Sequence, residues 1–146
     1  MLGILTWTVG IIFAILSGLH VYWALGGTWG LEATIPHTGK DRLFEPGKIG
    51  TSVIALLLAL AAWFVLELGG VVRVLFSYSL LPYGAWGLSI VFMIRAVGDF
   101  RWVGFFKRKK GTMFAKWDSI LFSPLCVFLA SATLVIMYLH GTHQWQ

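Results

Sequence analysis

Charged residues are scarce in this chain of 146 residues: they make up 12% of it, whereas hydrophobic residues make up 58%. Soluble domains average about 25% charged residues, and a soluble protein with so few could not cover its surface with polar groups. The scarcity therefore excludes an ordinary soluble domain and predicts an integral membrane protein. The length allows one membrane domain over residues 1–146, with little soluble structure beside it.

Cysteine occurs once, as Cys126 within a hydrophobic run, so an intrachain disulfide is excluded. A lone thiol in such a run is typically a small packing residue. Metal-ligand patterns are also poor, because His140 and His143 have no carboxylate beside them. The stretch "HTGKDRLFEPGK" lacks the glycine spacing of a phosphate-binding loop. We expect no metal site and no cofactor.

Long hydrophobic runs, by contrast, occur four times, at residues 2–25, 49–66, 74–94 and 119–139. A run of about 20 residues crosses a hydrocarbon core of about 30 Å as a helix. Backbone groups in lipid need partners within the same segment, so each run should be helical. The first run has no basic residues before it and is longer than the apolar part of a signal peptide, so we expect it to be retained. The sequence predicts an all-α membrane protein, a bundle of four transmembrane helices with short loops.

Basic residues are concentrated on one side of these runs. The two loops on that side carry nine, against Arg73 alone on the other side: Lys40, Arg42, Lys48, Arg101, Lys107, Arg108, Lys109, Lys110 and Lys116. The positive-inside rule then places both loops in the cytoplasm and both termini outside, in a bacterial inner membrane. Lys107, Arg108, Lys109 and Lys110 follow two phenylalanines and should meet anionic lipid headgroups, unless the loop is solvated and only sets topology. We expect no nucleic-acid partner.

Small residues at helical spacing predict where the helices pack. In the first run these are Gly10, Ala14 and Gly18, and the fourth has one stripe of Ser119, Ser123, Cys126, Ala130, Thr133 and Met137. Pro82 lies inside the third run and should kink its helix.

Several polar residues gather where the runs meet the cytoplasmic side. Arg95 and Asp99 are four apart, so on one helix they would form an ion pair on a face that points into the bundle. His20 lies near the same end of the first run, at similar depth. Asp118 opens the fourth run and should cap its helix.

These residues suggest a ligand-binding pocket just inside the cytoplasmic boundary: His20, Tyr22, Trp23, Arg95, Asp99, Arg101 and Asp118. The alternative is a simple anchor, in which Arg95 reaches the headgroups and His20 is a neutral imidazole bonded to a backbone carbonyl. If the site is catalytic, His20 and Asp99 are the candidates for proton transfer.

Three stretches carry a family resemblance: "LHVYWALGGTWG" at residues 19–30, "RAVGDFRWVGFFKRKKGTMFAKWDS" at 95–119 and "SPLC" at 123–126. They resemble a family of small four-span bacterial membrane proteins catalogued only as a domain of unknown function. The resemblance implies four helices and a bacterial origin. It implies no activity.

The leading hypothesis is a protein of the inner membrane that binds a lipid-like or small amphipathic ligand, or a membrane protein partner, through this polar cluster. One alternative is a membrane-embedded enzyme that acts on an isoprenoid or sterol-like substrate by proton transfer. A second alternative is an oligomeric transporter or channel, since four helices are few for an internal pore. Membrane lipids, anionic at the cytoplasmic face, are the expected partners.

Overall fold

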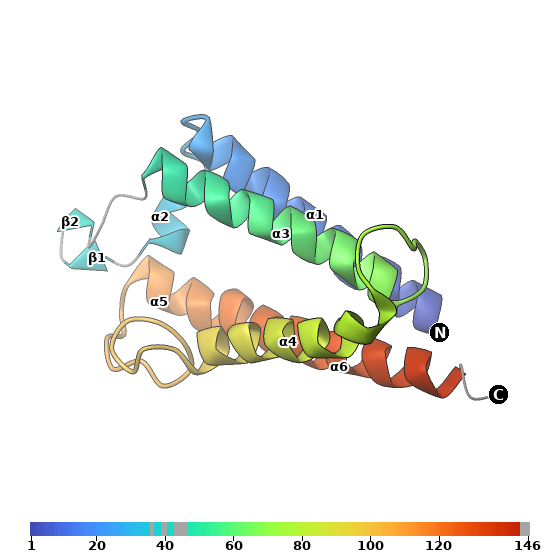
Figure 1. Ribbon diagram of the computed structural model, residues 1–146. Coiled ribbons are helices and arrows are strands. Elements are labelled where there is room, and N and C mark those ends of the chain that lie inside the picture. The colour runs from blue at the N-terminus through green and yellow to red at the C-terminus, as the bar shows by residue number, and fades with distance from the viewer. Residues whose placement is uncertain (36, 39–40, 43–46, 144–146) are drawn as a thin grey trace.

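Four apolar helical segments dominate the computed structural model (Figure 1), which describes all residues except 36, 39–40, 43–46 and 144–146. The first two are α1 (Leu2–Ala24) and α3 (Lys48–Leu68). The third is α4 (Leu81–Val97), preceded by a 3₁₀ turn at Tyr78–Leu80. The fourth runs from α5 (Met113–Trp117) through a π-helical segment (Asp118–Phe122) into α6 (Ser123–His143). Each is long and apolar enough to cross a membrane, which confirms the predicted all-α membrane fold.

The connection between α1 and α3 holds the only other regular elements of the described residues. It contains a single turn, α2 (Leu31–Thr34), and two short strands, β1 (His37–Thr38) and β2 (Asp41–Arg42), that pair antiparallel. This connection covers residues 26–47. Of this loop, α2 lies against α5, while Lys40 and residues 43–46 fall outside the described residues.

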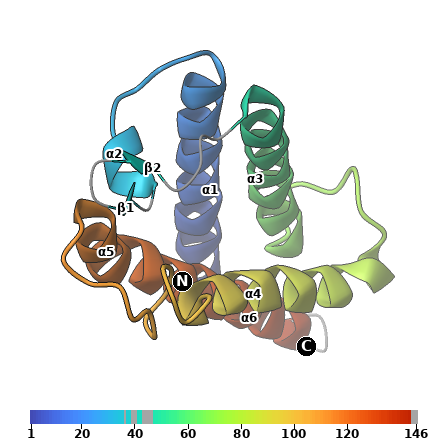
Figure 2. The same cartoon turned by 90° about the vertical axis from the view of Figure 1, so that its left-hand side faces the viewer.

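The four long helices form two hairpins, α1 with α3 and α4 with α6, which cross each other (Figures 1 and 2). One buried serine joins the helices of each hairpin. The Ser17 hydroxyl donates to the carbonyl of Ala55 at 2.8 Å, and the Ser89 hydroxyl donates to the carbonyl of Ala130 at 3.0 Å. In lipid, where apolar burial gives no net drive for association, such bonds and close contacts hold helices together.

The hairpins meet at the end of the molecule that holds the N-terminus, and they diverge toward the longer loops (Figure 1). Their shared core is apolar and includes Val9, Phe13, Val65, Leu129 and Ile136. At the same end Gly69 lies against Thr6, and Gly70 lies against His140. One end of the molecule therefore holds the start of α1, the turn after α3 and the end of α6. An even number of spans requires both termini to lie on the same side of a membrane.

Apolar side chains also cover much of the outer surface. On α1, Ile4, Trp7, Ile11 and Ile15 recur every three or four residues and are all at least half exposed. A helix with this stripe on the outside is unfavourable in water but suits contact with lipid.

Span boundaries differ from those predicted where carboxylates hold loops. The third span begins at Tyr78 rather than at residue 74, because Glu67 binds the backbone N–H groups of residues 74–76. Pro82 therefore lies in the first turn of α4, where it replaces no intrahelical bond, and the predicted kink is wrong. The fourth span begins at Met113 rather than at residue 119.

The predicted packing stripes are correct in part, more so in the fourth span than in the first. Along the fourth span, Ser123, Cys126, Ala130 and Thr133 are buried as expected, whereas Ser119 is exposed and Met137 is half-buried. In α1, Ala14 and Gly18 are exposed, and the buried positions are instead Thr6, Val9, Gly10, Phe13 and Ser17. Large side chains such as Phe13, and not only small residues, therefore form this seam. At Gly10, the side chain of Leu66 from α3 packs close against the glycine.

Candidate ligand-binding site

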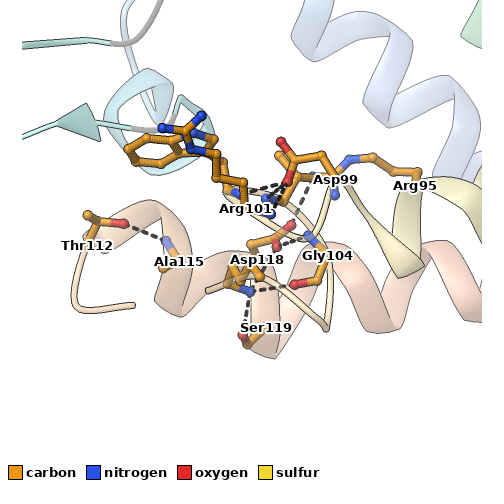
Figure 3. A network of polar contacts seen from close by, with 11 residues as sticks. Arg95, Asp99, Arg101, Gly104, Thr112, Ala115, Asp118 and Ser119 are labelled. Carbon is orange, nitrogen blue, oxygen red and sulfur yellow. Dashed lines mark hydrogen bonds and ion pairs between the residues drawn. The ribbon is translucent and has the colours of Figure 1, made fainter. Parts of the chain in front are cut away.

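A fully buried carboxylate, Asp118, organises the polar end of the hairpin formed by α4 and α6 (Figure 3). Its Oδ1 accepts from Arg95 Nη2 at 2.9 Å. Its Oδ2 accepts from Lys107 Nζ at 3.0 Å and from the backbone N–H of Gly104 at 2.7 Å. A buried charge is tolerated only when it is paired and hydrogen-bonded, and Asp118 is both.

Asp118 was predicted to cap the fourth helix, and this prediction is wrong. The cap is Thr112, whose hydroxyl accepts from the N–H of Ala115 at 3.0 Å. Asp118 instead begins the π-helical segment, well inside the continuous helix. A π-helical turn inserts an extra residue into a helix and is frequent at functional sites.

Lys107 was predicted to lie at the membrane surface, and the structure corrects this. The residue is only 4% exposed, and its ammonium donates to the Gly104 carbonyl, to Asp118 and to the Ser119 hydroxyl at 2.7–3.0 Å. All three of its donors are therefore used. The need to neutralise a buried carboxylate outweighs the attraction of a lysine for headgroups.

The predicted ion pair between Arg95 and Asp99 does not form, because α4 ends at Val97 and the two residues no longer share a helix. Asp99 Oδ1 instead accepts from the backbone N–H groups of Arg101, Trp102 and Val103 at 2.7–3.0 Å. Partial desolvation acts to raise the pKa of the Asp99 carboxyl, but these hydrogen bonds outweigh it and the pKa lies below its usual value. Asp99 thus shapes the loop.

Two glycines let this loop fold back onto the end of α4. Gly98 and Gly104 both have positive φ, at +84° and +87°. Gly98 packs against the backbone of Val103 and Gly104, and Gly104 packs against the backbone of Val97 and Gly98. A bond from the N–H of Phe105 to the carbonyl of Ala96, at 2.9 Å, closes the turn. Any side chain at either glycine would collide with backbone.

Beside Arg95, the diverging hairpins enclose a cavity of about 770 Å³. Pockets for small molecules are typically about 300–1,000 Å³ and mostly apolar. The lining is apolar except at the loop end, where His20, Trp23, Thr34 and Arg95 lie. The remaining lining residues come from all four long helices and their flanking segments: Leu16, Leu19, Ile54, Leu57, Leu58, Leu60, Ala61, Phe64, Phe76, Gly84, Gly87, Leu88, Val91, Phe92, Phe122, Leu125, Cys126 and Leu129.

The cavity opens sideways between α3 and α4. Leu57 and Leu60 of α3, and Gly87 and Val91 of α4, line the cavity and are exposed on the outer surface as well. Both helices are long and apolar enough to cross a membrane.

His20 is fixed at the polar end of the cavity by its own helix. Its Nδ1 lies 2.8 Å from the Leu16 carbonyl, so that nitrogen carries the proton and donates. In the neutral ring, Nε2 is then an acceptor. The ring packs edge-on against Trp23 at 5.0 Å, and the Trp23 indole N–H donates to the Trp29 carbonyl at 2.9 Å.

The structure brings together some of the predicted site residues and separates others. The cavity is lined by His20, Trp23 and Arg95. Asp118 does not line it but forms an ion pair with Arg95. Tyr22 points elsewhere: it is 44% exposed, packs on Gly27, and its hydroxyl lies 3.5 Å from the Trp29 N–H. Asp99 and Arg101 are exposed on the loop and do not line the cavity.

The rest of the basic run is exposed, as expected for residues 108–110. The Lys109 ammonium lies 5.5 Å from the centre of the Trp102 ring, a cation–π distance. Phe100, Phe105 and Phe106 are exposed in the same loop. Contact of this surface with lipid headgroups stays a prediction.

Comparison with known proteins gives a family. The family model "Protein of unknown function (DUF3995)" matches residues 13–133. The chain belongs to this family. The predicted membership of a family known only as a domain of unknown function is therefore confirmed. The DUF3995 segment contains His20, Arg95, Lys107 and Asp118, so the whole site lies within it. No curated protein and no solved structure matches the chain significantly.

Sequence reasoning missed the partnership of Lys107 with Asp118 and the cavity itself. Lys107 and Asp118 are 11 residues apart across an irregular loop, a spacing that no helical or strand period relates. The sequence did carry one signal, the carboxylate of Asp118 at the start of a hydrophobic run. A carboxylate that is buried at such a position needs a cation as a partner. Nothing in an apolar run distinguishes residues that line a cavity from those that pack.

Proposed function

We propose that this DUF3995 protein binds a lipid-like amphipathic molecule in the cavity between its two hairpins. The observation that carries the proposal is the cavity itself. It is apolar along its length, has polar side chains at one end only, and is lined by exposed residues of α3 and α4 that would face the bilayer if these helices span it. That polarity matches a molecule with one apolar chain and one polar head.

The geometry favours access from the membrane over access from water. A chain that moves between α3 and α4 would pass from lipid into the cavity without exposing apolar surface to water. The opening is lined by aliphatic groups and by Gly87, whose added Cβ would meet nothing within 4 Å. The polar head would come to rest near His20 and Arg95, at the level of the loops.

The proposal includes the orientation of the protein in a bacterial inner membrane. The excess of Lys and Arg in the two longer loops supports placing them in the cytoplasm and both termini outside. The polar end of the cavity would then lie at the cytoplasmic leaflet, where anionic lipids are available.

The test is to block the cavity and count retained lipid. Gly87→Phe would place a ring in the opening, whereas Gly18→Phe adds the same ring to an exposed position on α1 that does not line the cavity. Lipids bound to each purified variant are quantified by native mass spectrometry. We expect Gly87→Phe to lose most of the bound lipid and Gly18→Phe to retain wild-type amounts. Equal retention by both variants contradicts the proposal.

A further inference from the structure

Arg95 has a hydrogen-bonding group to spare. Its Nη2 pairs with Asp118, but its Nη1 is buried and finds no hydrogen-bond partner among the described residues. A buried donor left without an acceptor is costly, and a guanidinium donor more so than a neutral one. A planar guanidinium can serve two acceptors at once through its separate nitrogens.

The charges around this group do not balance. Arg95 and Lys107 contribute two positive charges, and Asp118, which pairs with both, contributes one negative charge. The other nearby carboxylate, Asp99, binds backbone N–H groups of its own loop. The ion-paired cluster of Arg95, Lys107 and Asp118 therefore carries one surplus positive charge at the edge of an apolar cavity, while Asp99 keeps its own negative charge and pairs with neither cation.

Of the two cations, only Arg95 can serve a ligand. The ammonium of Lys107 has all three donors engaged, and its side chain is 2% exposed. Arg95 lines the cavity, and its side chain is 36% exposed. Asp118 thus holds Nη2 of the guanidinium, Nη1 is buried as well, and the exposed remainder of the Arg95 side chain lines the cavity.

We propose that the head of the bound molecule is an anion, a phosphate or a carboxylate on a single apolar chain, and that the guanidinium of Arg95 is its main contact. This rests on the proposed function. The anion would neutralise the surplus charge of the cluster and accept hydrogen bonds from the guanidinium, in a region where low polarity strengthens both effects. A neutral head such as an alcohol would supply the acceptor without neutralising the charge.

The experiment compares three probes on the full chain in phosphatidylcholine nanodiscs: tetradecyl phosphate, tetradecanol and inorganic phosphate. Retention of each radiolabelled probe is measured against empty nanodiscs. We expect tetradecyl phosphate to bind about 10- to 100-fold more tightly than tetradecanol, the range of one charge-assisted hydrogen bond, and inorganic phosphate to bind far more weakly than either.

The outcomes separate the anion proposal from the cavity proposal. Equal binding of the phosphate and the alcohol overturns the anionic head but leaves the cavity as a lipid site. Binding of neither alkyl probe contradicts the proposed function itself. Inorganic phosphate that binds as tightly as tetradecyl phosphate overturns the apolar chain and points to a free-phosphate site.

Variants assign the selectivity to one residue. Arg95→Gln should abolish the preference for tetradecyl phosphate. Arg108→Gln, which removes an exposed arginine of the loop after α4, should keep this preference. If Arg95→Gln fails to fold, Arg95→Lys retains the charge for Asp118 but lacks a second planar nitrogen, and it should lose most of the preference. A full preference in either Arg95 variant overturns the assignment.

Discussion

The two ends of the bundle each use one buried carboxylate to hold a loop, but they satisfy it differently. At the end near the termini, Glu67 is 4% exposed and binds neutral donors, namely the Trp63 indole and the backbone N–H groups of residues 74–76. At the other end, Asp118 binds one backbone N–H and two cations.

The difference separates a structural carboxylate from one that prepares a site. Glu67 orders the turn between α3 and α4, and its hydrogen bonds account for that role. Asp118 also orders a loop, but it draws in one more positive charge than it can neutralise. It leaves one guanidinium nitrogen unpartnered among the described residues, beside the apolar cavity. Four predictions test this comparison.

The largest effect should come from Asp118→Asn. The neutral amide would leave Lys107 buried without a counter-charge, and breaking a buried pair costs about 3–5 kcal/mol. We expect a large fall in the unfolding temperature in detergent, measured by scanning fluorimetry, and loss of lipid retention. Asp99→Asn, at an exposed loop carboxylate, is the control and should change little. Wild-type stability in Asp118→Asn would contradict the role of the cluster.

Two glycine substitutions separate close packing from backbone conformation in the same loop. Gly104→Ala introduces a side chain at φ +87° directly against the backbone of Val97 and Gly98, whereas Gly111 has φ +91° and open space around it. We expect Gly111→Ala to cost about 1 kcal/mol from its backbone conformation alone, and Gly104→Ala to cost clearly more. Equal losses of unfolding free energy would show that the loop does not pack on α4 as described.

At the other end, Glu67→Gln should lower the unfolding temperature less than Asp118→Asn does, because its donors are neutral and one carbonyl oxygen remains to accept from them. Lipid retention should not change, since Glu67 does not line the cavity. Glu32→Gln, an exposed glutamate of α2, serves as the control. Loss of bound lipid in a Glu67→Gln variant that still folds would contradict the claim that only the Asp118 end contributes to ligand binding.

The smallest effect should be the pH dependence that Asp99 contributes. Because hydrogen bonds from the loop lower its pKa in the folded protein, its stabilisation is full above the pKa of the unfolded chain, about 3.9. It is lost as pH falls through the lower folded value. The contribution should stay under about 1 kcal/mol, because the side chain is exposed. The difference between wild type and Asp99→Asn in unfolding temperature should therefore shrink toward zero below pH 4, and a constant difference would argue against it.

The sequence was sufficient to predict the spans, because length and hydropathy alone decide whether a helix can cross a bilayer. It also placed His20 and Arg95 at one level, and both line the cavity. It failed where the chain leaves helical geometry. The expected pair of Arg95 with Asp99 assumed a helix that Gly98 ends, and the partners of Asp118 come from a loop with no regular period. Loop geometry follows from tertiary hydrogen bonds, which local patterns do not encode.

The most direct test of the central claim is competitive photolabelling in native membranes. A photoreactive alkyl phosphate is cross-linked with and without an excess of unlabelled compound, and the labelled peptides are mapped by mass spectrometry. We predict that the labelling removed by competition maps to residues 54–64 of α3 and 84–95 of α4, the two walls of the opening. Competed labelling on the outer stripe of α1, or labelling that competition leaves unchanged everywhere, would contradict a binding cavity between the hairpins.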